Sequence, residues 1–388
     1  MSKVSIIAGA LRSSLGQELQ AVGRALIAGQ GSPSTITLED FPDRPLPYFP
    51  ISGPAASGNG DEEQRLLTAL EACAGEALAG AGLDKEACTR TGLFLGSSSF
   101  AIGGAEQQYR QALASDDRAL ALPYQRYGDL ARHLSRRFGL AAGEFTFSTA
   151  CTSSANALLY ATRAIRSGRI KTALVVGVEG FNRTTLLGFE SLQLLSHSGY
   201  RPFDKNRSGL VLGEGIAAVV VASQDRLAPA KGWEGVHFLG GANGCDPSGL
   251  TCSSAESMAR VIQQALDESD TAPGEVTMIK AHATGSESND AAEAAAMQCI
   301  FDTNTPPPVT ALKGALGHAL GASGILELAA LIPCLKAGYV PPTSGFSEVD
   351  PALGCEPLLQ PTPFRGGRVL SNCFGFGGNN TSFVLEVD

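Results

Sequence analysis

The chain has 388 residues, of which 44% are hydrophobic and 17% charged, and its formal net charge is −9. This length predicts two domains or one large doubled unit, and the negative charge argues against a nucleic-acid-binding protein. Nine cysteines without a CxxC pair argue against a disulfide framework or a structural zinc site and indicate a reducing, cytoplasmic location.

The N-terminal part of the chain predicts strands and helices in turn. The brief apolar run at residues 4–8 predicts a first strand and not a signal peptide. Residues 32–59 are rich in Pro, Ser and Gly, which favours an irregular surface segment. Residues 61–81 have an acidic start and strong helix formers, as in a helix. Residues 91–96 predict a buried strand, and residues 107–140 a helical region with breaks.

The stretch 144–161, EFTFSTACTSSANALLYA, is the first candidate for chemistry. Residues 144–148 alternate as a strand does, and residues 156–165 have helical spacing, so Cys151 is expected on the turn between them. Unpaired N–H groups and the helix dipole at such a turn favour a thiolate, and a lowered thiol pKa makes a nucleophile. The alternative is that Cys151 is only a small buried hydrophobic residue.

The C-terminal part repeats the same order in outline. Strands are predicted at residues 171–177 and 215–222 before the repeat begins, and at residues 235–239, 276–281, 308–311, 368–372 and 381–387 within it, with a helix at 255–268. Helices 154–165 and 319–335 are apolar nearly all round, which indicates helices packed between two sheets. Residues 315–335 are too short and too polar to span a bilayer.

The two parts of the chain are expected to be structural duplicates. Strand 144–148 leads to Cys151 as strand 308–311 leads to His318, and strand 91–96 is answered by strand 276–281. We therefore predict an α/β protein with two halves, residues 1–230 with the cysteine and residues 231–388 with two histidines, with a seam near residues 228–233.

Two histidines, His282 and His318, lie in Gly-rich segments where a strand meets a loop. Either one alone is more often a structural group. Together with a cysteine, however, two neutral imidazoles can donate hydrogen bonds to one developing oxyanion, as when a thioester carbonyl becomes an enolate. The segment 372–380, NCFGFGGNN, offers backbone N–H groups for a second oxyanion. Its glycines flank an aromatic residue, which favours a loop that must move, and the alternative is a plain turn.

These motifs together resemble the β-ketoacyl-[acyl carrier protein] synthases of the thiolase superfamily. The resemblance rests on STACTSSANAL around Cys151, on RPFDKNRSGLVLGEGIA at 201–217, and on AHATGSESND, KGALGHALGASGILE and NCFGFGGNN, in this order along nearly the whole chain. Five ordered motifs are far more specific than one Gly-rich string. The resemblance implies a thiolase-like duplicated fold, layered αβαβα, with buried helices between two mixed sheets.

The resemblance also implies a mechanism and a set of site residues. Cys151 would take an acyl group from a carrier protein, and the enolate of a decarboxylated malonyl thioester would attack it. His282 and His318 would bind the malonyl carbonyl, while the N–H groups of Cys151 and Phe376 would form the other oxyanion hole, with Phe376 as a gate. Lys313 would support His318 through Glu327, and Asp290 would be a structural support of the site. The residues implied to bind substrate are Thr284, Ser286, Phe374, Gly375 and Gly377. Thr284 and Ser286 alternatively cap a turn, and Lys313 alternatively forms a structural ion pair.

Other charged residues have two readings. Arg201, Asp204, Arg207 and Glu214 are expected to form a buried structural charge network, and the alternative is that Lys205 and Arg207 help to make a basic rim for an acidic carrier protein. The cluster Arg163, Arg166, Arg169 and Lys171 is by default a solvated face. Phe100 is expected to line the acyl pocket.

The resemblance implies partners but no metal or redox cofactor. Substrates would arrive on the phosphopantetheine of acyl carrier protein, and the chain would form a homodimer or a heterodimer with a related ketosynthase subunit. Ser148, Ala283 and Ser286 depart from the family pattern and suggest a divergent secondary-metabolite or aryl-polyene type of synthase. The alternatives are a non-catalytic, chain-length-setting partner subunit and a thiolase, which generally needs a second cysteine; Cys373 is the nearby candidate.

Overall fold

The computed structural model of the protein describes residues 3–39, 41–53, 62–100, 102–115, 126–223, 229–247, 249, 254–302 and 305–388. Its strands join in one mixed sheet of ten strands and two small two-stranded sheets. Among the described residues, no helix is both long and apolar enough to cross a membrane.

The N-terminal half contributes five strands of the large sheet. They are β1 (Val4–Arg12), β4 (Thr91–Gly96), β5 (Glu144–Phe147), β6 (Thr172–Glu179) and β7 (Gly215–Ser223). Their order is β1-β7-β6-β4-β5, in which β6, β4 and β5 are parallel and β7 and β1 are antiparallel to their neighbours. β5 is therefore the edge strand of this half.

The C-terminal half repeats this arrangement. Its strands are β8 (Val236–Cys245), β9 (Val276–Lys280), β10 (Val309–Thr310), β13 (Gly367–Phe374) and β14 (Asn379–Val387). Their order is β8-β14-β13-β9-β10, with β13, β9 and β10 parallel. The strands predicted to correspond, β5 with β10 and β4 with β9, occupy equivalent positions. The halves meet through a short β1–β8 pairing at Val4–Phe238 and Ser5–His237, so the two expected sheets are joined at one edge.

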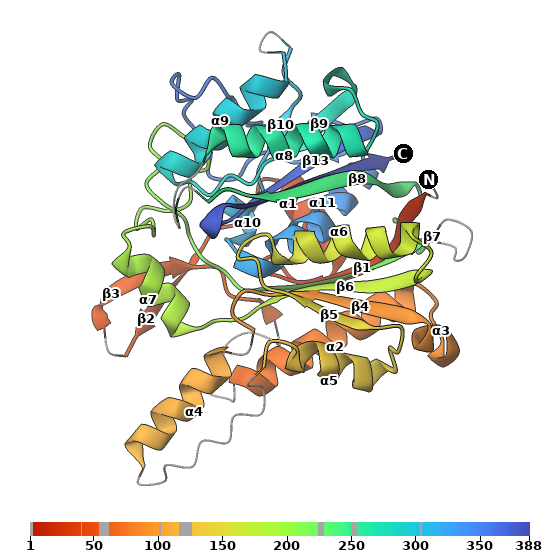
Figure 1. Ribbon diagram of the computed structural model, residues 1–388. Helices are drawn as coiled ribbons and strands as arrows, with labels where there is room; N and C mark the ends of the chain where they lie inside the picture. Colours follow the sequence, from red (N-terminus) through yellow and green to blue (C-terminus); the bar gives the residue numbers. More distant parts are fainter. Residues whose placement is uncertain are drawn as a thin grey trace.

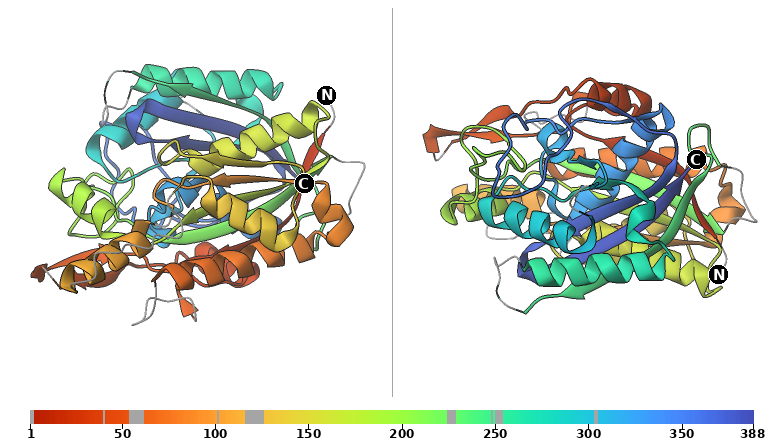
Figure 2. Two further views of the ribbon diagram at one scale, coloured as in Figure 1. Left: turned by 60° about the horizontal axis from the view of Figure 1, so that its bottom comes forward. Right: turned by 90° about the horizontal axis from the view of Figure 1, so that it is seen from above.

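Helices lie on both outer faces and between the halves, as the layered αβαβα arrangement predicts (Figure 1). α2 (Glu62–Gly80) and α5 (Asp129–Phe138) pack on the N-terminal strands, and α8 (Ala255–Glu268) and α9 (Glu287–Ile300) pack on the C-terminal strands. α6 (Ser153–Arg166) and α11 (Ser323–Lys336) fill the middle layer. The two views of Figure 2 place both termini at the same end of the molecule.

The two middle helices cross at close range because small residues meet at the crossing. A Cβ atom on Gly324 of α11 would lie 2.6 Å from the backbone nitrogen of Ala155 in α6, closer than real Cβ contacts. The backbone N–H of Ile325 also donates to Ser154 Oγ at 3.2 Å. All residues of α11 except Lys336 are buried, and each buried Leu or Ile stabilises the fold by roughly 1.5–3 kcal/mol.

The prediction of an irregular segment at residues 32–59 was wrong in its middle part. β2 (Ser34–Leu38) and β3 (Phe41–Tyr48) form an antiparallel pair. Thr35, Ile36 and Thr37 favour extended backbone, and Leu38, Leu46 and Tyr48 are buried. Residues 54–60 lie outside the described residues.

Several short elements were not predicted. They are α1 (Leu19–Ile27), α3 (Lys85–Thr89), α7 (Arg183–Ser191), α9, and the small β11 (Tyr339–Val340) and β12 (Thr362–Pro363) pair. The expected region 107–140 contains the end of α4 (Ile102–Ala114) and all of α5, while residues 116–125 lie outside the described residues. The division of the chain at residue 230 falls in the connection between β7 and β8 and stays a proposal.

Candidate active site

Cys151 lies on the turn between β5 and α6, as predicted. Ala150, just before it, has a φ of +50°, a conformation that a residue with a side chain adopts only when its surroundings hold it there. The holding contacts are hydrogen bonds from Thr152 Oγ1 to the Thr149 carbonyl at 2.7 Å and from Ser153 Oγ to the Ala150 carbonyl at 2.6 Å. The turn thus fixes the direction of the thiol, which is only 5% exposed with the whole residue counted.

His318 reaches the cysteine from the other half of the chain. It follows α10 (Lys313–Leu316), and its backbone N–H donates to the carbonyl of Val211 at 2.8 Å. Its Nε2 lies 3.1 Å from Cys151 Sγ, and its Nδ1 lies 3.1 Å from Ser323 Oγ. A buried imidazole is therefore in hydrogen-bond contact with the thiol.

His282 completes the group from the end of β9. Its ring centroid lies 5.4 Å from that of His318, with the rings nearly perpendicular. One ligand-type atom from each of Cys151, His282 and His318 lies within 4.8 Å of the others, and all three residues are buried. The structure therefore brings together the three side chains that the sequence singled out.

The expectation that the helix start lowers the thiol pKa was wrong. Burial raises the pKa of Cys151 to about 12, although the charge of Lys313 and a hydrogen bond from the backbone N–H of Phe376 act in the opposite direction. Burial, followed by the charge of Lys313, holds the pKa of both His282 and His318 well below the usual range. The resting site thus contains an uncharged thiol beside two uncharged imidazoles.

Lys313 supports a different histidine from the one predicted. Its Nζ lies 2.7 Å from the His282 carbonyl and 3.2 Å from His282 Nδ1, and it pairs with Glu327 Oε1 at 2.7 Å. An ammonium group can only donate hydrogen bonds, so Nδ1 of His282 must accept and its proton must lie on Nε2. Lys313 thereby sets the tautomer of His282.

Lys280 is a buried site residue that sequence reasoning missed. Its Nζ pairs with Glu327 Oε2 at 2.7 Å and donates to the Asn372 carbonyl at 2.7 Å. The signal for it was present, because Lys280 is the one charged residue in the apolar strand VTMIK and stands two positions before His282. One carboxylate thus bridges two ammonium groups beneath the histidines.

The Gly-rich loop packs directly on the cysteine. A Cβ atom on Gly375 would lie 3.1 Å from the backbone nitrogen of Cys151, and Gly377 has a φ of +74°. The Phe376 ring stacks on Phe189 of α7 with centroids 5.6 Å apart, and the buried Phe374 lies 6.2 Å from the His282 ring. The backbone N–H of Phe376 consequently points at the Cys151 sulfur.

The segment after His282 is held by two buried carboxylates. Asp290 accepts from the backbone N–H groups of Thr284 and Gly285 at 2.9 and 3.1 Å. Glu293 accepts from the backbone N–H groups of His282 and Ala283. Ser286 is the N-cap of α9, so the alternative of a capping role applies to it. The predicted contact of Thr284 and Ser286 with substrate stays a prediction.

The cysteine and the two histidines are also a donor set that suits a transition metal. Their surroundings do not suit one. Lys313 and Lys280 place two ammonium groups near the imidazoles, and Lys313 Nζ lies only 3.2 Å from His282 Nδ1. These ammonium groups would repel an added cation, so the arrangement fits hydrogen bonding to an anionic intermediate better than metal binding.

Other predicted residues have separate surroundings. Instead of one network, Arg207 pairs with Asp350 at 2.6 Å, Glu214 pairs with Arg65, and Asp204 accepts from the backbone of Ser347 and Glu348. Lys205 pairs with Glu348, so these cations do not form an unbalanced basic rim. Phe100 is buried, with its ring 4.9 Å from that of Tyr127.

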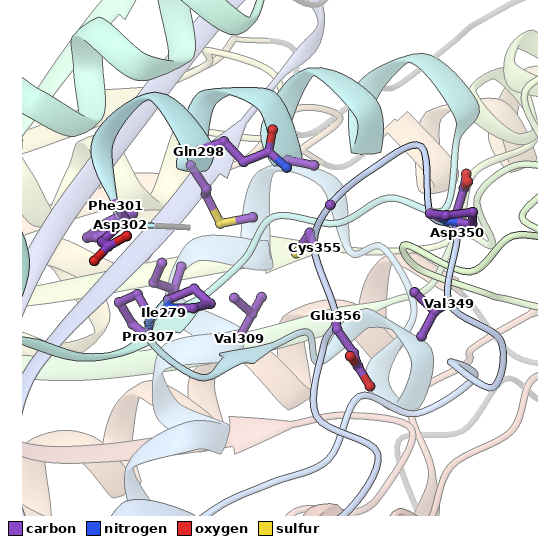
Figure 3. A pocket seen from close by; sticks show the side chains of 15 residues that line it. Ile279, Gln298, Phe301, Asp302, Pro307, Val309, Val349, Asp350, Cys355 and Glu356 are labelled. Atoms are coloured by element: carbon purple, nitrogen blue, oxygen red, sulfur yellow. The ribbon is translucent and has the colours of Figure 1, made fainter. Parts of the chain in front are cut away.

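A surface pocket of about 310 Å³ is lined by Ile279 of β9 together with residues such as Gln298 and Cys355 (Figure 3). Ile279 lines this pocket with Phe301 and Val309, whereas Lys280, the next residue along the strand, turns inward. Cys355 lies in its wall. The pocket is therefore separate from the cysteine and the two histidines.

Two protein-family models match most of the chain. The family model "Beta-ketoacyl synthase, N-terminal domain" matches residues 48–226, and "Beta-ketoacyl synthase, C-terminal domain" matches residues 238–347. The tetracenomycin polyketide synthase ketoacyl synthase alpha subunit of Streptomyces glaucescens is 31% identical over 93% of this chain and 91% of its own. The chloroplastic 3-oxoacyl-[acyl-carrier-protein] synthase I of Arabidopsis thaliana is 27% identical over 99% and 86%.

Solved structures of ketosynthases have the same fold as this chain. The ishigamide ketosynthase/chain length factor has a TM-score of 0.89 at 26% identity, covering 100% of this chain and 99% of the other. A ketosynthase in complex with its chain length factor from Xenorhabdus doucetiae has a TM-score of 0.84 at 26% identity, covering 100% and 98%.

Proposed function

Because the chain belongs to the β-ketoacyl synthase family, we propose that Cys151, His282 and His318 catalyse the decarboxylating condensation of an acyl thioester with a malonyl thioester. The observation that carries these assignments is the 3.1 Å contact between Cys151 Sγ and His318 Nε2, with His282 beside them. The enzyme is an acyltransferase with a thiolase-like fold.

The first half-reaction transfers the acyl group to Cys151. As the sulfur attacks the thioester carbonyl, its proton passes to Nε2 of the uncharged His318, so no free thiolate is needed beforehand. The backbone N–H groups of Cys151 and Phe376 stabilise the carbonyl oxygen as it gains negative charge. The departing carrier thiol takes the proton, and the acyl group stays on Cys151.

The second half-reaction uses both imidazoles as hydrogen-bond donors. The malonyl carbonyl accepts from Nε2–H of His282 and of His318, the carboxylate leaves as CO2, and the resulting enolate attacks the acyl carbon. The Cys151 thiolate then leaves and is protonated. His318 must accept at Nε2 in one half-reaction and donate there in the other. Ser323 accommodates both, because its hydroxyl can accept from or donate to Nδ1.

This chemistry requires no metal or redox cofactor in our proposal, since loss of CO2 drives formation of the carbon–carbon bond. Substrates would be carried on the phosphopantetheine arm of an acyl carrier protein, and acyl carrier protein is part of the name of the Arabidopsis relative. We place the protein in the cytoplasm, because the cysteines within the described residues are free thiols.

We also propose that the protein works as a dimer, with a second copy or with a related ketosynthase-type subunit. β5 is an edge of the large sheet, and Phe145 on this strand is 50% exposed. Unpaired strand edges with exposed aromatic side chains are natural pairing surfaces. The Xenorhabdus ketosynthase was solved with its chain length factor, which supports the heterodimer as one form.

Two other roles suit the site less well. A non-catalytic chain-length-setting subunit has no need of a cysteine and two histidines in mutual contact. A thiolase would use a second cysteine as base, but Cys373 is fully buried in β13 and lies 3.9 Å from Lys280 Nζ.

The test is intact-mass analysis of the purified protein after incubation with acyl carrier protein thioesters of graded length. We expect a mass increase equal to one acyl group in the wild type and no increase in Cys151→Ala. Release of CO2 from a malonyl carrier thioester then separates a synthase from a thiolase. Acylation at another residue, or no decarboxylation by the acylated enzyme, would refute the assignment.

A further inference from the structure

Lys280 and Glu327 form a fully buried ion pair that the reaction above does not use. Lys280 is the last residue of β9, and its side chain is turned toward the middle layer, where it reaches Glu327 of α11 and the Asn372 carbonyl of β13, each at 2.7 Å. The sulfur of Cys373 lies 3.9 Å away. A lysine is rarely buried completely unless its charge is matched.

The hydrogen bonds of Lys313 show what this ion pair does. The ammonium of Lys313 donates hydrogen bonds to the His282 carbonyl and to His282 Nδ1, and it forms an ion pair with Glu327 Oε1 at 2.7 Å. The other carboxylate oxygen of Glu327 is occupied by Lys280. Without Lys280, both oxygens of Glu327 would be available to Lys313 and would draw the ammonium away from His282 Nδ1.

We propose that Lys280 is a positioning residue for the decarboxylation step: by holding one oxygen of Glu327, it keeps Lys313 against His282 and so keeps the Nε2–H of His282 directed at the malonyl carbonyl. This inference rests on the proposed function of the site. It assigns a role to a residue that does not touch the substrate and acts through two neighbours.

The same arrangement also controls charge. Lys280 and Lys313 place two ammonium groups near the imidazoles, which disfavours protonation of His282 and His318. The charged or titratable groups that face them are Lys280, Lys313, Glu327, Glu293, Cys151, Cys373 and Tyr200. Lys313 and Lys280 both act to lower the pKa of His282 and of His318. Removal of Lys280 is therefore expected to let the histidines protonate at higher pH.

The experiment compares the two half-reactions in Lys280→Met, which keeps the apolar stem and removes the ammonium. We expect the kcat of malonyl decarboxylation to fall at least ~10-fold with KM within ~3-fold, and Cys151 acylation to stay within ~3-fold. The acid limb of the decarboxylation pH profile should move up by about one unit. Lys171→Met, at an exposed lysine, is the matched control.

A double-mutant cycle tests the route through Glu327. If Lys280 acts through this carboxylate, adding Lys280→Met to Glu327→Gln should cause little further loss of decarboxylation. Lys280→Leu, which removes both the charge and the hydrogen-bond donors, replaces Lys280→Met if that variant does not fold, and the same loss is expected.

Three results would overturn the inference: wild-type decarboxylation in the Lys280 variant, equal losses in both half-reactions, or full additivity with Glu327→Gln. Failure of the proposed function itself would look different, because the wild-type protein would then show neither acylation at Cys151 nor decarboxylation.

Discussion

Cys151 Sγ and His318 Nε2 lie 3.1 Å apart although 167 positions of sequence separate the two residues. Each side chain is held by its own half of the chain, Cys151 by the turn after β5 and His318 by the segment after β10. The nucleophile and its base therefore meet only when the two halves are packed together.

Replacement of the two histidines should separate their roles. Because His318 contacts the sulfur, His318→Ala should lower both Cys151 acylation and malonyl decarboxylation by roughly 100-fold. His282→Ala should lower decarboxylation by about the same factor but acylation by less than ~10-fold. Single-turnover acylation by mass spectrometry and CO2 release measure the two steps. His133→Ala is the control, since His133 pairs with Glu71 in another part of the molecule; equal acylation losses in both active-site variants would contradict the assignment.

Gly375→Ala should impair acylation without unfolding the protein. The backbone at Gly375 is extended, with a φ of −126°, so alanine is not strained there. Its Cβ atom, however, would lie 3.1 Å from the Cys151 nitrogen and 3.5 Å from its Cβ. We expect a ~10- to 100-fold slower acylation rate because the loop must move away from the sulfur, with little change in Tm. Gly274→Ala, where the new Cβ meets nothing within 4 Å, should leave the rate unchanged.

The buried thiols should make the protein less stable at alkaline pH. Burial raises the pKa of Cys73, Cys151, Cys334 and Cys355 to about 12, from an ordinary value of 9.0. Between pH 9 and 12 the unfolded chain loses these protons while the folded chain keeps them. The free energy of unfolding therefore falls as pH rises, by roughly 1.4 kcal/mol per pH unit for each thiol.

Urea unfolding at several pH values between 8 and 11 measures this slope. Cys73→Ala is the informative variant, because Cys73 lies on the buried face of α2 and takes no part in the site. It should be less stable than the wild type at pH 8 but should have a shallower slope above pH 9. An unchanged slope would show that Cys73 does not retain its proton in the folded state.

The proposed dimer surface predicts a change of size. Phe145→Asp places a charge on the exposed edge strand β5, so it should shift the protein toward monomer in light scattering at micromolar concentration. Leu359→Asp is the matched control, since Leu359 is similarly exposed, at 47%, but lies far from β5 in sequence. The same mass for both variants would exclude β5 as the contact.

The sequence predicted the sheets better than the surface elements. Strands such as 91–96 and 215–222 are almost continuous apolar runs because both faces of the sheet are covered, and such runs have few other interpretations. The β2–β3 pair was missed because its prolines and polar residues dominate the pattern, while its pairing depends on Leu38, Leu46 and Tyr48 finding a buried face. That face is supplied by distant parts of the chain.

The candidate site shows the same limit. Motif spacing indicated Cys151, His282 and His318, and the fold brings them together. The prediction that the pKa of Cys151 is lowered was wrong because burial of the thiol outweighs the effect of the α6 N-terminus. Burial cannot be recognised from a local sequence pattern. Lys313 pairs with Glu327 as expected, but its contact with His282 in place of His318 was not predicted, because only the fold places its ammonium there. Lys280 was missed for the same reason.

The crossing of α6 and α11 at Gly324 has a consequence for how accurately this catalyst is assembled. Cys151 lies two residues before α6, and His318 lies five residues before α11. The distance over which a proton passes between them therefore depends on the distance between the axes of the two helices. At Gly324 the backbones of the two helices are in direct contact. The distance between the helix axes is therefore set by covalent geometry and can vary very little. One added methyl group at position 324 would push the two helices apart. We expect this to lower the turnover rate more than the stability of the fold.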